Sequence, residues 1–129
     1  MAYNGPVHRW DTYWAYLDPS VGSEQGGRAR PVIVVSNDGF NSAFPIVTMV
    51  PVTKQEGKRR SAYPFEVLLP RGTITADWSS IVMIQQVRSI SRKRLLRPIG
   101  ALRNEAHRAA IAKRLLEHFD ISFKGGEER

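Results

Sequence analysis

Residues 19–38, PSVGSEQGGRARPVIVVSND, contain the transition that decides the fold. The first half is polar and rich in glycine, and the second half becomes the apolar run VIVV at 32–35. Such a run, closed by the turn-forming sequence NDG at 37–39, predicts a buried strand that follows a loop. Arg30 comes directly before Pro31, whose ring restricts the chain. We therefore expect the arginine to be held firmly at the start of that strand.

Further strands are predicted on both sides of this segment. In residues 11–18, Tyr13, Ala15 and Leu17 alternate with a second set of side chains, which is the period of a strand. The other predicted strands are residues 44–53, residues 63–70 with Phe65, Val67 and Leu69 facing one way, residues 79–90, and residues 97–102. Pro45 and Pro51 indicate free backbone edges in the strand 44–53.

The period changes near the end of the chain. Ala112, Leu115, Leu116 and Phe119 recur at helical spacing, which predicts an amphipathic helix over residues 104–119 with Asn104 as its N-cap. Short strands with tight turns and one final helix favour a mainly β fold with a C-terminal α-helix, in the form of a small, strongly curved antiparallel barrel or half-barrel. Dimerisation would cover the exposed strand edges of such a barrel.

The chain of 129 residues is expected to be one domain, residues 1–129, with its core at about 10–121 and flexible termini at 1–7 and 124–129. It has no cysteine, no apolar run long enough to span a membrane and no apolar signal region at its start, which fits a cytoplasmic protein. The net charge of +7 favours nucleic acid, acidic proteins or anionic lipid as partners.

The sequence predicts no metal cofactor. The histidines are His8, His107 and His118, and the last two stand about three turns apart on the predicted helix. No H-E-x-x-H pair, G-x-S-x-G elbow or Walker loop is present. We therefore expect neither metal nor other cofactor.

Three polar segments are candidates for binding. The loop 22–30 carries Glu24, Gln25, Arg28 and Arg30, and its glycines allow close approach of a ligand. The segment after Thr53 carries Lys54, Lys58, Arg59 and Arg60, with Tyr63 and Phe65 just beyond. The third segment carries Gln85, Gln86 and Arg88. Cations interleaved with aromatics suit single-stranded RNA, and glutamines can read base edges. Each segment taken alone is also compatible with a solvated surface loop or strand end that binds nothing.

Five blocks together resemble the MazF/PemK family of toxin endoribonucleases from bacterial toxin–antitoxin pairs. They are YWAYLDPSVGSEQGG, RPVIVVSNDGFN, VPVT, YPFEVLL and QVRSI, in the order of the family and near its spacings. The resemblance implies an SH3-like barrel, a homodimer and metal-independent, sequence-specific cleavage of single-stranded messenger RNA. It also implies neutralisation by a small acidic antitoxin of the MazE kind.

The resemblance also implies roles for three residues. Arg30 matches the family's active-site arginine before proline, Thr53 matches its threonine at the end of the third strand, and Glu24 matches an acid implicated in some members. Arginine is a persistent planar donor, so we assign Arg30 to the phosphate. Thr53 would hold a non-bridging oxygen, and Glu24 would be the base. The products expected are a 2′,3′-cyclic phosphate and a 5′-hydroxyl.

The chain departs from the family pattern at three places. Arg28 and Ala29 separate Gly27 from Arg30, one residue more than usual, and Arg28 could share the role of Arg30. Trp10 stands where a glycine is usual, and Gln85 stands where an acid is frequent. Two other readings stay open: a CcdB-like toxin that binds gyrase and cleaves nothing, and a catalytically silent RNA-binding barrel.

Overall fold

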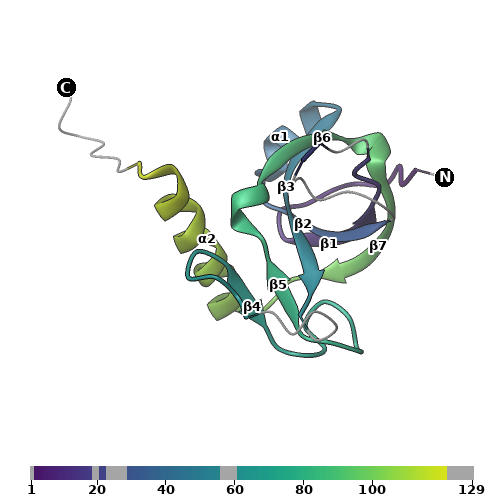
Figure 1. Cartoon of the computed structure of the whole chain (residues 1–129). Helices are drawn as coiled ribbons and strands as arrows, with labels where there is room; N and C mark the ends of the chain where they lie inside the picture. The colour runs from purple at the N-terminus through teal and green to yellow at the C-terminus, as the bar shows by residue number, and fades with distance from the viewer. Residues whose placement is uncertain (1, 19–20, 23–28, 56–60, 122–129) are drawn as a thin grey trace, which may run out of the picture.

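The computed structural model describes residues 2–18, 21–22, 29–55 and 61–121. Within these residues the chain forms seven strands, two α-helices and two short 3₁₀ helices (Figure 1). The strands are β1 (Asp11–Ala15), β2 (Arg30–Val34), β3 (Ile46–Lys54), β4 (Val67–Leu69), β5 (Ser80–Val82), β6 (Arg88–Ser91) and β7 (Leu95–Ala101). The helices are α1 (Asp38–Ala43), η2 (Ile84–Gln86), η3 (Arg92–Arg94) and α2 (Glu105–Phe119).

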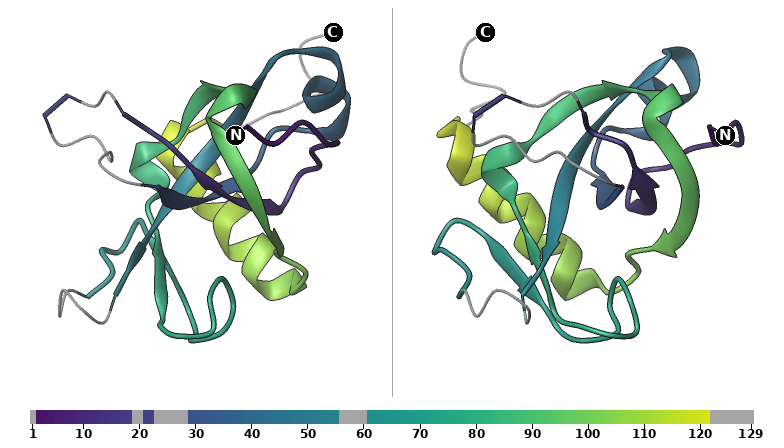
Figure 2. Two further views of the ribbon diagram at one scale, coloured as in Figure 1. Left: turned by 90° about the vertical axis from the view of Figure 1, so that its right-hand side faces the viewer. Right: turned by 45° about the vertical axis from the view of Figure 1, so that its right-hand side comes forward.

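The strands form one antiparallel sheet in the order β4-β5-β3-β2-β1-β7, with β6 paired to the first half of β3. Figures 1 and 2 show the sheet curling round on itself, with α2 lying against the β4–β5 side and α1 near β6. The register between β1 and β7 shifts twice, and such irregularities increase the bend of a sheet. In the described part of the chain the sheet stays open. The expected mainly β fold with a C-terminal helix is confirmed.

β3 organises this sheet. One of its edges pairs with β2, while the other pairs first with β6 and then with β5. Pro51 lies between the β6 and β5 pairings, and its carbonyl accepts a hydrogen bond from the Met83 amide at 2.9 Å. Because proline has no N–H, its place in the gap between two ladders leaves no donor unpaired.

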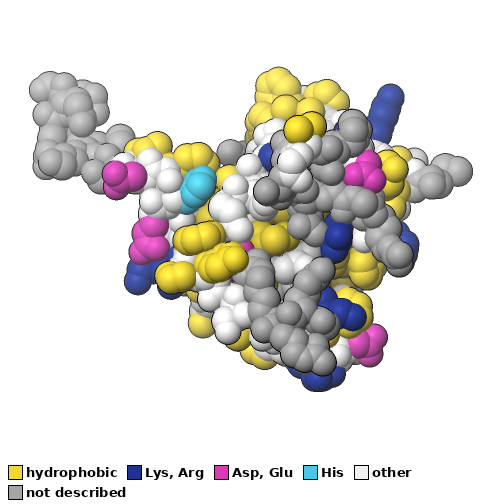
Figure 3. Space-filling model, viewed as in Figure 1, with side chains coloured by type: hydrophobic (Ala, Val, Ile, Leu, Met, Phe, Trp, Pro, Cys, Tyr) yellow, Lys and Arg dark blue, Asp and Glu magenta, His cyan; other side chains and the backbone are white. Residues whose placement is uncertain are grey.

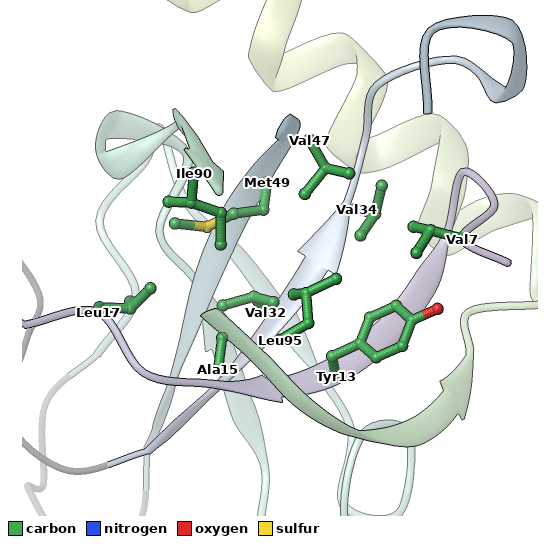
Figure 4. Close-up of a cluster of buried hydrophobic side chains, with 10 residues drawn as sticks. All are labelled: Val7, Tyr13, Ala15, Leu17, Val32, Val34, Val47, Met49, Ile90 and Leu95. Atoms are coloured by element: carbon green, nitrogen blue, oxygen red, sulfur yellow. The ribbon is translucent and has the colours of Figure 1, made fainter. Parts of the chain in front are cut away.

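Two hydrophobic cores lie on the two faces of the sheet. The first fills the inside of the curl and is drawn in Figure 4; its buried residues are Val7, Tyr13, Ala15, Leu17, Val32, Val34, Val47, Met49, Ile90 and Leu95. The second lies between the other face and α2; its buried residues are Ile33, Val50, Val52, Val67, Leu69, Ile74, Val82, Ile84, Leu102 and Ile111. Val32 and Ile33 therefore serve different cores, which explains why the run 32–35 is continuously apolar.

Three local predictions are wrong. The turn predicted at 37–39 is the beginning of α1, because the Asn37 side chain accepts a hydrogen bond from the Phe40 amide at 2.8 Å and caps the helix. The single strand predicted over 79–90 is broken by η2 into β5 and β6. The strand predicted over 63–70 is only β4, and Phe65, which is 45% exposed, does not join Val67 in the core.

The N-terminal segment is packed where a frayed end is predicted. The Tyr3 amide donates to the Leu95 carbonyl at 2.7 Å, and Val7 is buried in the first core. The Tyr3 ring lies 5.1 Å from that of Tyr13. Burial, and then the nearby Asp11 carboxylate, raise the pKa of the Tyr13 hydroxyl, so it stays neutral and serves packing. Tyr3 and Val7 thus contribute to the first core.

The bounds and the cap of the C-terminal helix agree with the prediction, but Leu116 and Phe119 of the predicted apolar face are 64% and 54% exposed. Asn104 caps α2 by accepting a hydrogen bond from the His107 amide at 3.1 Å. Ile111, a residue of α2, is fully buried in the second core. Neither described helix is both long enough and apolar enough to cross a bilayer. The end at 124–129 lies outside the described residues.

Trp10 has a φ of 77°, which is unusual for a residue with a side chain. Its amide donates to the Val34 carbonyl and its carbonyl accepts from the Leu102 amide, each at 2.7 Å, so the backbone is fixed. The ring packs against the second core, with the Arg108 guanidinium 5.8 Å from its centre. Trp10 is thus a packing residue, and its contacts with the core and with α2 offset the strain of this backbone conformation.

This strain gives a prediction. Replacing Trp10 loses packing in every case, but Trp10→Gly should be more stable than Trp10→Ala by about 1 kcal/mol, because glycine accepts a positive φ without cost. Urea unfolding of the two variants measures the difference. Trp14 is a strand position without positive φ. There the alanine variant should be more stable than the glycine variant. Equal stability of the two Trp10 variants would show that the position is unstrained.

Candidate functional site

The start of β2 and the end of β3 bring Arg30 and Thr53 together. The register between these strands pairs Val32 with Pro51, the last pair of the ladder, and the same register continued for two residues sets Arg30 opposite Thr53. Opposed residues of antiparallel strands project from the same face, with Cβ atoms about 5 Å apart. Thr53 is only 8% exposed, and Arg30 is partly exposed. A guanidinium and a hydroxyl therefore share one end of one face of the sheet.

Both residues lie in paired backbone. Arg30 is opposite Ala15 of β1, and Thr53 is opposite Ile81 of β5. The backbone of each is thus fixed by an outer neighbouring strand, while the β2–β3 ladder itself pairs residues 32–34 with 49–51. Two adjacent donors on a rigid backbone suit a tetrahedral anion such as a phosphate.

Of the other residues predicted for the site, some lie nearby and some do not. Lys54 directly follows Thr53 and is exposed. Arg88 pairs with Met49 and so faces the same side as Thr53, but about 13 Å away along β3. Gln86 is partly buried in η2. The residues that fall outside the described part of the chain are Glu24, Gln25, Arg28, Lys58, Arg59 and Arg60.

An exposed pair of aromatic rings stands in the turn before β4. Tyr63 and Phe65 stack with their centres 5.4 Å apart and their planes at 23°. They are 50% and 45% exposed. Stacked, half-exposed rings suit an unpaired nucleobase, and Phe65 stays a predicted RNA-binding residue.

Residues 8–119 match the model of the PemK-like, MazF-like toxins of type II toxin–antitoxin systems. The chain belongs to this family. It is 37% identical over 120 residues to the protein "Endoribonuclease MazF9" of Mycobacterium tuberculosis, an alignment that covers 89% of this chain and 98% of that protein.

Solved MazF structures share the fold. The crystal structure of MazF from Deinococcus radiodurans superimposes with a TM-score of 0.76 at 26% identity, covering 92% of this chain and all of that one. A mycobacterial endoribonuclease in complex with its cognate antitoxin superimposes with a TM-score of 0.71 at 18% identity, covering 91% of this chain and 98% of that one.

Gln85, at a position where MazF-like toxins were expected to carry an acid, has an internal partner. Its Nε2 donates to Glu66 Oε2 at 2.7 Å, and the other oxygen of Glu66 accepts from the Tyr63 amide at 2.9 Å. Glu66 is only 4% exposed. A carboxylate at position 85 would meet that of Glu66, so the amide is the matching side chain here. In this arrangement the Gln85 amide nitrogen holds the carboxylate that fixes the aromatic turn.

Sequence reasoning misses two tryptophans of this region. Trp14 and Trp78 line a cavity that also touches Arg30 and Lys54. Trp14 has the sequence context of an ordinary strand residue. Trp78 lies far from Arg30 in the sequence, so no local pattern connects the two. The alternation of β1 could have indicated Trp14, because this large side chain lies on the strand face opposite to the buried Tyr13 and Ala15.

The Gln85–Glu66 pair gives a prediction. Gln85→Glu should destabilise the protein at pH 7, because two carboxylates in one buried site repel each other and hold the pKa of one above its usual range. The loss should appear only as the pH rises above the ordinary carboxyl range and should be absent in acid, where the pair shares a proton. Urea unfolding between pH 4 and pH 8 measures it.

The exchanged variant Gln85→Glu with Glu66→Gln is the control, since it restores one acid and one amide. It should recover most of the stability and lose the pH dependence. If Gln85→Glu alone unfolds like the unchanged protein at every pH, the two side chains do not interact.

Proposed function

We propose that this chain is a toxin endoribonuclease that cleaves single-stranded RNA without a metal ion, with Arg30 and Thr53 at the reacting phosphate. The observation that carries the proposal is the β2–β3 register, which brings these two residues to one face of the sheet. The name of the mycobacterial relative, at 37% identity over most of the chain, supports the same activity. The net charge of +7 favours a polyanionic substrate.

The reaction uses the nucleophile that RNA itself carries. The ribose 2′-oxygen attacks the adjacent phosphorus, the bond from phosphorus to the 5′-oxygen breaks, and a 2′,3′-cyclic phosphate and a 5′-hydroxyl remain. Glu24 takes the proton of the 2′-hydroxyl, and the departing 5′-oxygen receives a proton from Arg30 or from water. DNA lacks the nucleophile and is not cleaved.

Arg30 and Thr53 act on the charge that develops at the phosphate. A guanidinium is a planar donor that can give two parallel hydrogen bonds to phosphate oxygens. The Thr53 hydroxyl donates to a non-bridging oxygen. Because the backbone of both residues is already paired, little ordering remains to be done when the RNA binds.

Other residues extend the RNA contact. Lys54 and Arg88 are cations within reach of neighbouring phosphates, Phe65 offers a ring for a base, and Gln86 is a candidate for base edges. The set proposed from the sequence also includes Gln85, Gln25, Arg28, Lys58, Arg59 and Arg60. Phosphate contacts give affinity, whereas the aromatic and amide groups contribute preference for particular bases.

The proposed partners are a second copy of the chain and a small acidic antitoxin of the MazE kind, in the cytoplasm. The structure of a mycobacterial endoribonuclease with its cognate antitoxin supports the second. Large hydrophobic side chains are exposed on α2 and around β4, and Figure 3 shows hydrophobic side chains on this side of the molecule. The residues are Tyr63, Phe65, Leu68, Leu116, Phe119 and Ile121. A homodimer would cover part of such a surface.

Cleavage of a long single-stranded RNA in EDTA tests the activity. Arg30→Ala and Thr53→Val should each slow cleavage by about 100-fold or more, as expected when a donor to the developing charge is removed. Folding should be preserved in both, as circular dichroism can check. Arg103→Ala, which removes an exposed arginine elsewhere, is the matched control and should cleave normally.

Three results would count against this function. A Thr53→Val protein with full activity would remove Thr53 from the mechanism. Tight binding of RNA that stays intact would favour a silent RNA-binding barrel. Growth arrest in cells whose RNA is intact, with trapped gyrase, would favour a CcdB-like toxin.

The basic segment after β3 gives a prediction on binding. Replacing Arg59 and Arg60 with alanine should weaken RNA affinity, because fewer counterions are released from the RNA. The slope of log K against log salt should fall by about 0.7 for each phosphate that the protein no longer neutralises. Titrations of a non-cleavable 2′-O-methyl RNA at several salt concentrations measure the slope. An unchanged slope would mean that these side chains do not touch phosphates.

A further inference from the structure

A cavity of about 300 Å³ opens beside Arg30, at the end of the sheet where β2 begins. It is lined by Trp14, Ala29, Arg30, Pro31, Val52, Lys54 and Trp78. Its size is at the lower end of the range for small-ligand sites in proteins. None of the described residues that line it is acidic, so the cavity is suited to a neutral or anionic ligand.

Three neighbouring strands supply an apolar floor. Trp14 is opposite Pro31 in the β1–β2 ladder, and the continued β2–β3 register sets Pro31 opposite Val52. These three side chains therefore form one row across the sheet. Trp78, from the turn before β5, adds a second indole to the lining.

Cations stand against both tryptophans. The Lys54 ammonium lies 4.7 Å from the centre of the Trp78 ring, and the Arg97 guanidinium lies 5.3 Å from that of Trp14. Such contacts orient an indole ring and keep positive charge next to it. The cavity thus combines flat aromatic walls with a cationic rim, a combination that suits a nucleobase and its attached phosphate.

Arg30 connects this cavity with the proposed catalytic face. Its side chain is on the same face as Thr53, and the residue also lines the cavity beside Pro31. A nucleotide whose phosphate contacts Arg30 would therefore lie next to the aromatic lining of the cavity. A protein partner would have no comparable need for a cavity joined to a phosphate site.

We propose that this cavity takes one unpaired base of the RNA, adjacent to the linkage that is cleaved, and that Trp78 is a specificity-determining residue. The proposal rests on the proposed function and adds to it the position of one base. Trp78 stacks on the base, Trp14 forms part of the floor, and Lys54 turns toward the neighbouring phosphate when the base enters.

The test uses the intact protein and short 2′-O-methyl oligoribonucleotides, which bind without being cleaved, with 2-aminopurine placed at each position in turn. Stacking should quench the fluorescence at one position next to the scissile linkage. Trp78→Ala should abolish this quenching and weaken binding roughly 5- to 150-fold, the usual cost of losing one stacked base. Trp78→Phe, which keeps a ring, should lose less. Trp10→Phe, at a tryptophan packed against the second core, should change neither measurement.

An abasic site at the quenched position gives an independent arm. With the unchanged protein, the abasic RNA should bind as weakly as intact RNA binds to Trp78→Ala. With Trp78→Ala, removing the base should weaken binding little further, because base and ring form one contact. This arm needs only the unchanged protein if Trp78→Ala does not fold.

The outcomes separate this proposal from the proposed function. If RNA is cleaved but affinity, quenching and site preference are the same in the Trp78 variants, the base assignment is overturned and the nuclease stands. If the base stacks on Trp78 but no RNA is cleaved, the assignment is supported and the nuclease fails. Binding of an acidic peptide that Trp78→Ala weakens, with oligonucleotide binding unchanged, would also overturn the assignment.

Discussion

The backbone pairing of β3 is the constraint on which the rest of the structure depends. This strand pairs with β2 along one edge and with β6 and β5 along the other, so it joins the two halves of the curled sheet. Pro51 permits the change of partner, because a residue without an N–H leaves no donor unpaired between the two ladders. A shift of β3 by one residue would exchange the two hydrophobic faces and move Thr53 away from Arg30.

The same pairing connects stability with chemistry. Alternate residues of β2 and β3 fill the two cores. Arg30 is the first residue of β2, and Thr53 directly follows the buried Val52 near the end of β3. Burial of their neighbours therefore fixes the backbone that carries the proposed catalytic donors. Rigid backbone holds such donors in place before the substrate arrives, which is what stabilisation of a developing charge requires.

Two departures from the pattern of the family are accommodated locally. Trp10 takes a backbone conformation that favours glycine, and its ring is held by the second core and by α2. Gln85 replaces an acid and donates to the buried Glu66, whose carboxylate in turn fixes the turn that carries Tyr63 and Phe65. In both cases the unusual side chain contacts a residue distant in the sequence. Each departure from the MazF pattern is therefore matched by a second residue of this chain.

The sequence by itself determined the main strands, the C-terminal helix with its Asn104 cap, and the two residues of the proposed catalytic pair. It could do so because period, capping and the Arg-Pro and VPVT blocks are local signals. It did not determine the break of residues 79–90 at η2, the packed N-terminal segment or the internal role of Gln85. Only the tertiary structure decided these features, and only it placed Trp14, Trp78 and Arg30 around one cavity. Contacts between residues so far apart depend on how the sheet curls, and no local pattern encodes that curvature.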